Sequence, residues 1–147
     1  MKFIFIIISV VSISACVTFP KNSVELESKS KFRYEFNINR DLPKVEESFD
    51  TYMSKCHDSK KQLTVYLNHA RIGPEMGFDK IKEDGRVKYS TYYGGELSSK
   101  KYIWSFDLSI DGVNDNVTNV KIVTFTKLWE SPLNNLKKIA NGESNSC

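Results

Sequence analysis

Alternating apolar and polar positions predict five β-strands along the chain. The first spans residues 32–38, where Phe32, Tyr34, Phe36 and Ile38 alternate with polar residues and therefore share one face. The next three are predicted over residues 63–67, 87–93 and 102–110. The clearest apolar face belongs to the segment 102–110 and consists of Tyr102, Trp104, Phe106, Leu108 and Ile110.

The fifth predicted strand, residues 117–128, has apolar residues on both sides. Val120 and Ile122 share one parity, whereas Val123 and Phe125 share the other. This change of parity indicates either a β-bulge or burial on both faces of the sheet.

Two segments have the spacing of amphipathic helices. Asp41 and Pro43 are start signals for the first, and its apolar stripe consists of Val45, Phe49, Tyr52, Met53 and Cys56. The second begins at Ser131-Pro132, ends near Gly142, and has a face made of Leu133, Leu136 and Ala140. Residues 70–85 contain several turn signals and show no assignable period.

The order strand, helix, four strands, helix predicts an α+β domain over residues 32–147. Long apolar strand faces need a cover, so we expect a curved antiparallel sheet of about five strands with both helices on one face. The order loosely resembles helix-grip domains, the START-like and Bet v 1-like folds, in which a sheet wraps a C-terminal helix around an apolar cavity. The final helix predicted here is short for that arrangement.

The chain begins with an apolar run over residues 3–13 that follows Lys2. This length is typical of the central region of an export signal and is too short to cross a hydrocarbon core of ~30 Å. The run leads into Ile13-Ser14-Ala15-Cys16, which resembles the lipobox of bacterial lipoproteins. The resemblance implies that residues 1–15 are removed and that Cys16 carries acyl chains. The alternative is an ordinary secretory signal cleaved after Ala15, which leaves Cys16 as a free thiol.

Acylation of Cys16 implies stable attachment to a membrane. Val17, rather than aspartate, follows the cysteine, so the sorting pattern of Gram-negative lipoproteins implies the periplasmic side of the outer membrane. Residues 17–31 are mostly polar and without period. We therefore predict that residues 16–31 form the lipidated N-terminus and a flexible tether.

If Cys16 is acylated, two of the three cysteines remain, in a compartment that oxidises thiols. We predict that Cys56 and Cys147 form a disulfide, which for so long a loop contributes roughly 4–5 kcal/mol. The alternative is two unpaired thiols.

Composition and motifs give little sign of chemistry. The net charge is +3, with basic residues scattered along the chain, so no nucleic-acid partner is expected. His57 lies between Cys56 and Asp58, but adjacent helical residues do not face one another, and we interpret it as a solvated helix end. We find no metal-ligand spacing, phosphate-binding glycine loop or nucleophile elbow, so we expect no metal, no cofactor and no enzymatic activity.

Tyr66, Tyr92 and Ile103 alternate with the inward-facing apolar positions of their predicted strands and therefore point to the opposite, open face of the sheet. They are a candidate contact surface. The leading hypothesis is a non-catalytic envelope lipoprotein that acts through protein contacts, either as an accessory subunit or as an immunity-type protein that blocks a toxin. The alternative is a binding module that holds a lipid or another apolar ligand between sheet and helices. The sequence predicts no oligomeric state.

Overall fold

A five-stranded antiparallel sheet forms the centre of the protein. The computed structural model describes residues 18–58, 65–67, 70–72, 76–94, 99–112, 114–128 and 130–143. The strands lie in the order β1 (Phe32–Ile38), β7 (Asn114–Thr124), β6 (Lys101–Asp111), β5 (Arg86–Tyr93) and β4 (Met76–Glu83). All four neighbouring pairs are antiparallel.

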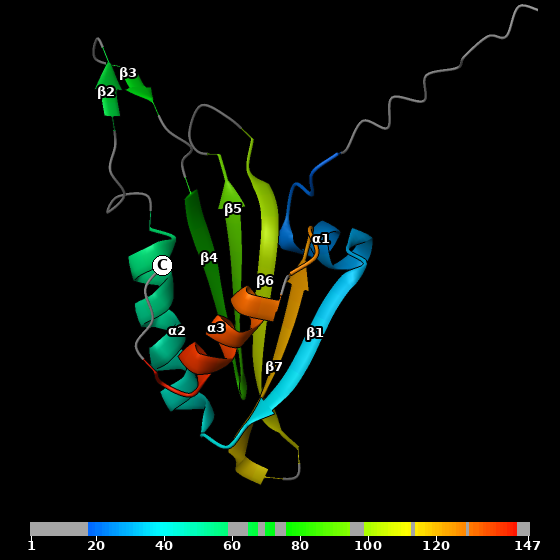
Figure 1. Cartoon of the computed structure of the whole chain (residues 1–147). Coiled ribbons are helices and arrows are strands. Elements are labelled where there is room, and N and C mark those ends of the chain that lie inside the picture. Colours follow the sequence, from blue (N-terminus) through cyan, green and yellow to red (C-terminus); the bar gives the residue numbers. More distant parts are fainter. Residues whose placement is uncertain are drawn as a thin grey trace, which may run out of the picture.

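Helices lie on both faces of this sheet (Figure 1). The helices α2 (Leu42–Cys56) and α3 (Glu130–Ala140) cover one face, where they share a core with the sheet. The short helix α1 (Ser23–Lys29) contacts β6 and β7 from the opposite face. The α+β class and the placement of the two longer helices on one face are therefore confirmed, whereas the prediction of only two helices is wrong.

The strand order also differs from the prediction. The segment predicted as a strand over residues 63–67 contains β2 (Val65–Leu67), which pairs with β3 (Ala70–Ile72) in a separate hairpin. The edge strand β4 comes instead from residues 70–85, where the sequence shows no regular spacing of apolar residues. Its apolar pattern is hidden because Lys80 and Lys82 occupy positions on the helix-covered face, where they pair with carboxylates of α2.

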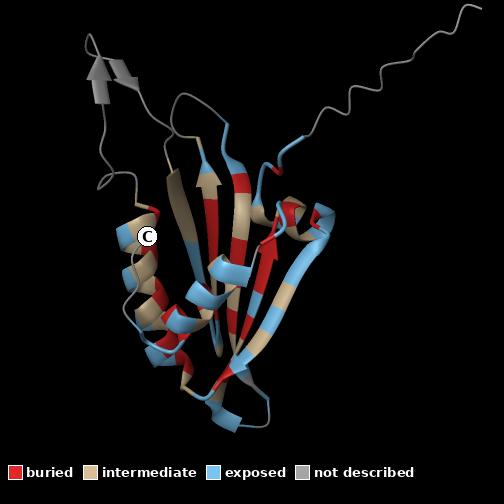
Figure 2. Ribbon diagram, viewed as in Figure 1, coloured by how far each residue is buried: buried red, intermediate tan, exposed pale blue. Residues whose placement is uncertain are grey.

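The main core fills the space between the sheet and the helices α2 and α3. Phe49 of α2 lies at its centre, with ring centroids 6.0 Å from Tyr89 and 5.6 Å from Phe106. In the apolar stripe predicted for α2, Val45, Phe49 and Met53 are buried, whereas Tyr52 and Cys56 are half-buried. Figure 2 shows buried residues along α2 and along the central strands β5, β6 and β7.

A β-bulge in β6 changes the face of its first residues. Thr91 pairs with Trp104, whereas the next residue, Tyr92, pairs with Tyr102, so Ile103 is an extra residue in β6. Tyr102 therefore leaves the apolar face predicted for residues 102–110. It packs on the α1 side instead, and its ring centroid is 5.5 Å from that of Tyr92.

A second, smaller core lies under α1. Leu26 is fully buried against Tyr102 and Val123, with Tyr92 and Phe125 packed at its margin. β7 is thus buried on both faces, with Val120 and Ile122 in the main core and Val123 in the second core. Beyond α1 this side carries polar side chains that pair across strands, as Arg86 does with Asp107, together with the half-exposed Ile81.

The prediction of a flexible tether is wrong for residues 18–31. Asn22 caps α1 by accepting the backbone N–H of Glu25 at 2.8 Å. The Pro20 carbonyl accepts the N–H of Tyr102 at 2.8 Å, and the Ser30 hydroxyl donates to the Thr124 carbonyl. A helix of 7 residues with a single buried side chain shows no period in sequence, which is why the pattern missed it.

The packing of α1 is testable by paired truncations on the same helix. We expect Leu26→Ala to lower the free energy of unfolding by about 2–5 kcal/mol, because it leaves a cavity in the second core. Val24→Ala is the matched control, since Val24 is 72% exposed and its truncation changes little packing. Chemical denaturation of the three proteins measures both changes, and equal stabilities for the two variants would contradict the packing of α1.

Candidate functional site

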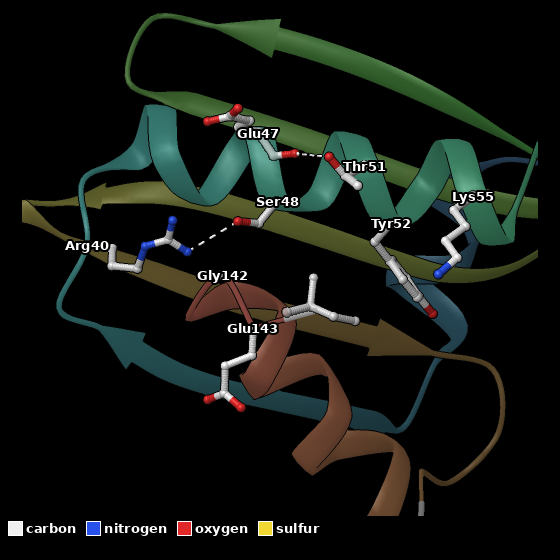
Figure 3. A pocket seen from close by; sticks show the side chains of 9 residues that line it. Arg40, Glu47, Ser48, Thr51, Tyr52, Lys55, Gly142 and Glu143 are labelled. Carbon is white, nitrogen blue, oxygen red and sulfur yellow. Dashed lines mark hydrogen bonds between the residues drawn. The ribbon is translucent and has the colours of Figure 1, made fainter. Parts of the chain in front are cut away.

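The candidate site is a groove between α2 and the C-terminal end of α3 (Figure 3). Its volume is about 410 Å³. Both walls carry polar side chains, and the lining consists of Arg40, Glu47, Ser48, Thr51, Tyr52, Lys55, Ile139, Gly142 and Glu143.

Arg40 holds one end of the groove together. Its Nη1 atom donates to the Ala140 carbonyl at 2.7 Å and to the Ser48 hydroxyl at 3.2 Å. The Arg40 carbonyl in turn accepts the Thr118 hydroxyl at 2.8 Å. The guanidinium thereby satisfies a carbonyl at the end of α3, where a positive charge is also favoured by the helix dipole.

Gly142 allows α3 to end against this arginine. Its φ is +82°, and its N–H bonds to the Ile139 carbonyl while that of Glu143 bonds to the Lys138 carbonyl, both at 2.9 Å. This pattern is a Schellman motif, as the predicted glycine stop implies. A Cβ atom at position 142 would lie 2.7 Å from Arg40 Nη1, so glycine is needed for the approach as well as for the backbone conformation.

The two aliphatic hydroxyl groups of the groove are bonded to their own helix. Ser48 donates to the Lys44 carbonyl and Thr51 to the Glu47 carbonyl, each at 3.0 Å. Nucleophilic catalysis requires a hydroxyl aligned with a base, and these hydroxyls are directed to backbone oxygens instead. The groove offers a surface with charges of both signs, from Arg40 and Lys55 on one hand and Glu47 and Glu143 on the other.

Behind the groove, His57 is buried at the end of α2. Only 6% of the residue is exposed, so the prediction of a solvated helix end is wrong. Its Nε2 atom lies 3.3 Å from the Tyr52 hydroxyl, and its ring contacts those of Tyr52 and Trp104 at centroid distances of 5.2 and 6.1 Å. The end of α2 thus packs on β6 rather than facing solvent.

Burial shifts the protonation of this aromatic cluster. Desolvation lowers the pKa of His57 to about 4 and raises the pKa of Tyr52. His57 is therefore neutral at physiological pH. Tyr52 belongs to both features, because it lines the groove and contacts the imidazole.

Cys56, the residue before His57, is the last residue of α2. Its predicted partner Cys147 lies outside the described residues, so the Cys56–Cys147 pairing stays a prediction. Cys16, the predicted acylation site, also lies outside them.

The three residues of the predicted contact surface lie on three different strands, β2, β5 and β6. Tyr92 packs against Tyr102 in the second core, and the Lys100 ammonium lies 4.0 Å from the centroid of its ring. Gly77 opposite Tyr92 makes room for the ring, since a Cβ there would lie 2.6 Å from the tyrosine oxygen. Ile103 is the bulge residue of β6, and Tyr66 belongs to the separate β2–β3 hairpin.

The groove itself was missed by sequence reasoning. Arg40 stands alone in the sequence, and its partner carbonyl at Ala140 comes 100 residues later. The one usable signal was Gly142, which marks the end of α3 but not what that end contacts.

Within the described residues, no group of three or more histidine, cysteine and acidic side chains is placed to hold a metal ion. None of the helices in that same part of the chain combines the length and apolarity needed to cross a membrane. No protein-family model matches the chain, and no curated protein matches it.

The buried His57 makes stability depend on pH. We expect the free energy of unfolding to fall as pH drops from about 6.5 to about 4, because the unfolded chain binds a proton at His57 that the folded protein excludes. The stabilisation is fully present above pH 6.5, and the loss reaches at most about 3 kcal/mol, at about 1.4 kcal/mol per pKa unit.

The control is His57→Gln, which keeps a polar side chain but does not titrate. The difference in unfolding free energy between the wild type and this variant should shrink towards low pH, because all other groups cancel. Denaturant titrations over that pH range measure it, and a constant difference would show that His57 is solvated.

Proposed function

We propose that this protein is an envelope lipoprotein, attached through acyl chains on Cys16 after removal of residues 1–15. The observation that carries the proposal is the apolar run followed directly by Ile13-Ser14-Ala15-Cys16. Val17 favours the periplasmic side of the outer membrane in a Gram-negative cell. The domain that follows Cys16 then faces the periplasm.

In this proposal the domain acts through protein contacts and does not catalyse a reaction. Ser48 and Thr51 are bonded to helix carbonyls, so the groove favours recognition over nucleophilic chemistry. Its mixed charges around a partly apolar floor, to which Ile139 contributes, are typical of the polar margin of a protein interface. We therefore take the α2–α3 groove as the contact surface, whether the protein is an accessory subunit or an immunity-type protein.

The packing of the core favours this function over an apolar-ligand module. The aromatic rings that would line a cavity between sheet and helices contact one another instead. The Phe49 ring lies against those of Tyr89 and Phe106, and the ring centroids of Trp104 and Phe106 are 5.9 Å apart. These rings support the sheet–helix packing and leave the outer groove as the recognition surface.

A Cys56–Cys147 disulfide fits the same proposal. It would fasten the end of the chain to the end of α2, beside Lys55 and Tyr52 of the groove. The bond is consistent with an oxidising compartment, as the export signal requires.

The experiment combines acylation and contact in the same cells. Cells that express the full chain are given an alkyne analogue of palmitate and then fractionated. We expect the wild type to be labelled and bound to membranes, and Cys16→Ser to be unlabelled. Cys147→Ser is the matched control, because it removes a cysteine outside the lipobox and keeps the label. An unlabelled wild type would overturn the proposal.

A photo-reactive amino acid placed at Glu47, on the groove, reads out contact in those cells. We expect it to give a discrete adduct with one envelope protein. The same residue at Glu83, an exposed position at the β4–β5 turn, is the control and should give none. Equal adducts from both positions, or none from Glu47, would contradict contact through the groove.

A further inference from the structure

The folded domain begins very close to Cys16. Only Val17 and Thr18 separate Cys16 from Phe19, so the Cα atoms of Cys16 and Phe19 are at most about 11 Å apart. The headgroup layer of one leaflet is about 5–7 Å thick. A cysteine whose acyl chains are inserted in the bilayer therefore keeps Phe19 at the membrane surface.

Phe19 is fixed to the sheet and cannot act as part of a spacer. Its ring centroid is 4.7 Å from that of Phe125, which follows β7. The next residue, Pro20, accepts the N–H of Tyr102 through its carbonyl. Because one contact is to β6 and the other to the residue directly after β7, the position of Phe19 sets the position of the whole domain.

The end of the molecule around Phe19 has a surface suited to lipid headgroups. We call it the anchor end: it comprises α1, the starts of β1 and β6, and the end of β5. Its exposed apolar side chains are Phe19, Val24, Phe32 and Tyr93. Its exposed basic residues are Lys21, Lys29, Lys31, Arg33 and Lys101. The two acidic residues of α1, Glu25 and Glu27, are paired with Lys29 and Lys88. The Lys101 ammonium lies 5.7 Å from the centroid of the Phe19 ring.

Aromatic rings beside lysines are typical of side chains at a membrane interface, where the ring enters the headgroup layer and the ammonium stays in water. Each lysine near an anionic leaflet adds about 1 kcal/mol of attraction. The opposite end of the sheet, at the β4–β5 and β6–β7 turns, exposes the acidic residues Glu83, Asp84 and Asp115. Its exposed basic residues, Lys82 and Arg86, are paired with Glu46 and Asp107. The charge difference favours one orientation of the domain.

We propose that the anchor end lies directly on the phospholipid headgroups, with no flexible spacer, so that the strands stand on the membrane and the β6–β7 turn points into the periplasm. This inference rests on the proposed acylation of Cys16 and adds the protein surface that meets the lipid. The α2–α3 groove lies on the helix-covered side of the sheet and then opens at a defined height above the membrane.

Tryptophan fluorescence of the acylated full-length protein tests the orientation. Phe19→Trp probes the anchor end, and Ile110→Trp is the matched control at the opposite end, because the two native residues are 39% and 38% exposed. Both variants are purified from membranes with their acyl chains and reconstituted in vesicles of phosphatidylethanolamine and phosphatidylglycerol. The vesicles contain a phosphatidylcholine brominated near the glycerol end of its chains, and the native Trp104 and Trp129 contribute equally to both samples.

We expect brominated lipid to reduce the emission from position 19 by about half, as for a ring at the headgroup–acyl boundary, and to leave that from position 110 unchanged. Val24→Trp gives the same readout if Phe19→Trp does not fold. Protein that sediments with vesicles but shows no quenching at 19 or 24, or equal quenching at 110, overturns the orientation and leaves the anchor intact. Protein that does not sediment overturns the acylation, and the orientation with it.

Discussion

The burial of Leu26 against Tyr102 and Val123 is the contact on which this structure depends. It covers the second face of the sheet beneath α1 and fixes where the folded domain begins. A sheet with only α2 and α3 would leave Val123 and Phe125 exposed on its other side. Because α1 occupies that place, the chain from Thr18 onward belongs to the domain, and an anchor at Cys16 has no spacer behind it. Fold and proposed membrane geometry thus follow from the same contact.

Sequence patterns predicted the elements whose burial is periodic and local. The strand over 32–38 and the helix ending at Cys56 were predicted correctly, because each shows its full apolar face in sequence. The failures have physical causes. In β4 the helix-facing positions carry Lys80 and Lys82, which are neutralised by Glu46 and Asp50 of α2, and in β6 a bulge at Ile103 moves Tyr102 to the other face. Neither effect is visible before the partner strand or helix is in place.

The candidate site was less predictable than the fold, because it is made of contacts between distant parts of the chain. Arg40 closes the groove by bonding to Ser48 and to the Ala140 carbonyl, and Gly142 permits that approach. His57 shows the same limit: its neighbours in sequence indicated a solvated helix end, whereas Tyr52 and Trp104 bury it. The result is a polar groove between two helices, backed by an aromatic cluster, which suits the proposed recognition of a protein partner from a membrane anchor.

Hydrogen exchange of the full-length protein tests the central claim most directly. The amides of Leu26, Ser30 and Tyr102 donate to the carbonyls of Asn22, Leu26 and Pro20 at 3.0, 2.9 and 2.8 Å. The account predicts that all three exchange slowly, with protection like that of the central strands, because they open only when the second core opens. Exchange of the Leu26 and Ser30 amides at the rate of an unstructured peptide would show that residues 18–31 are a flexible tether. It would contradict both the packing of α1 and the proposed orientation of the domain on the membrane.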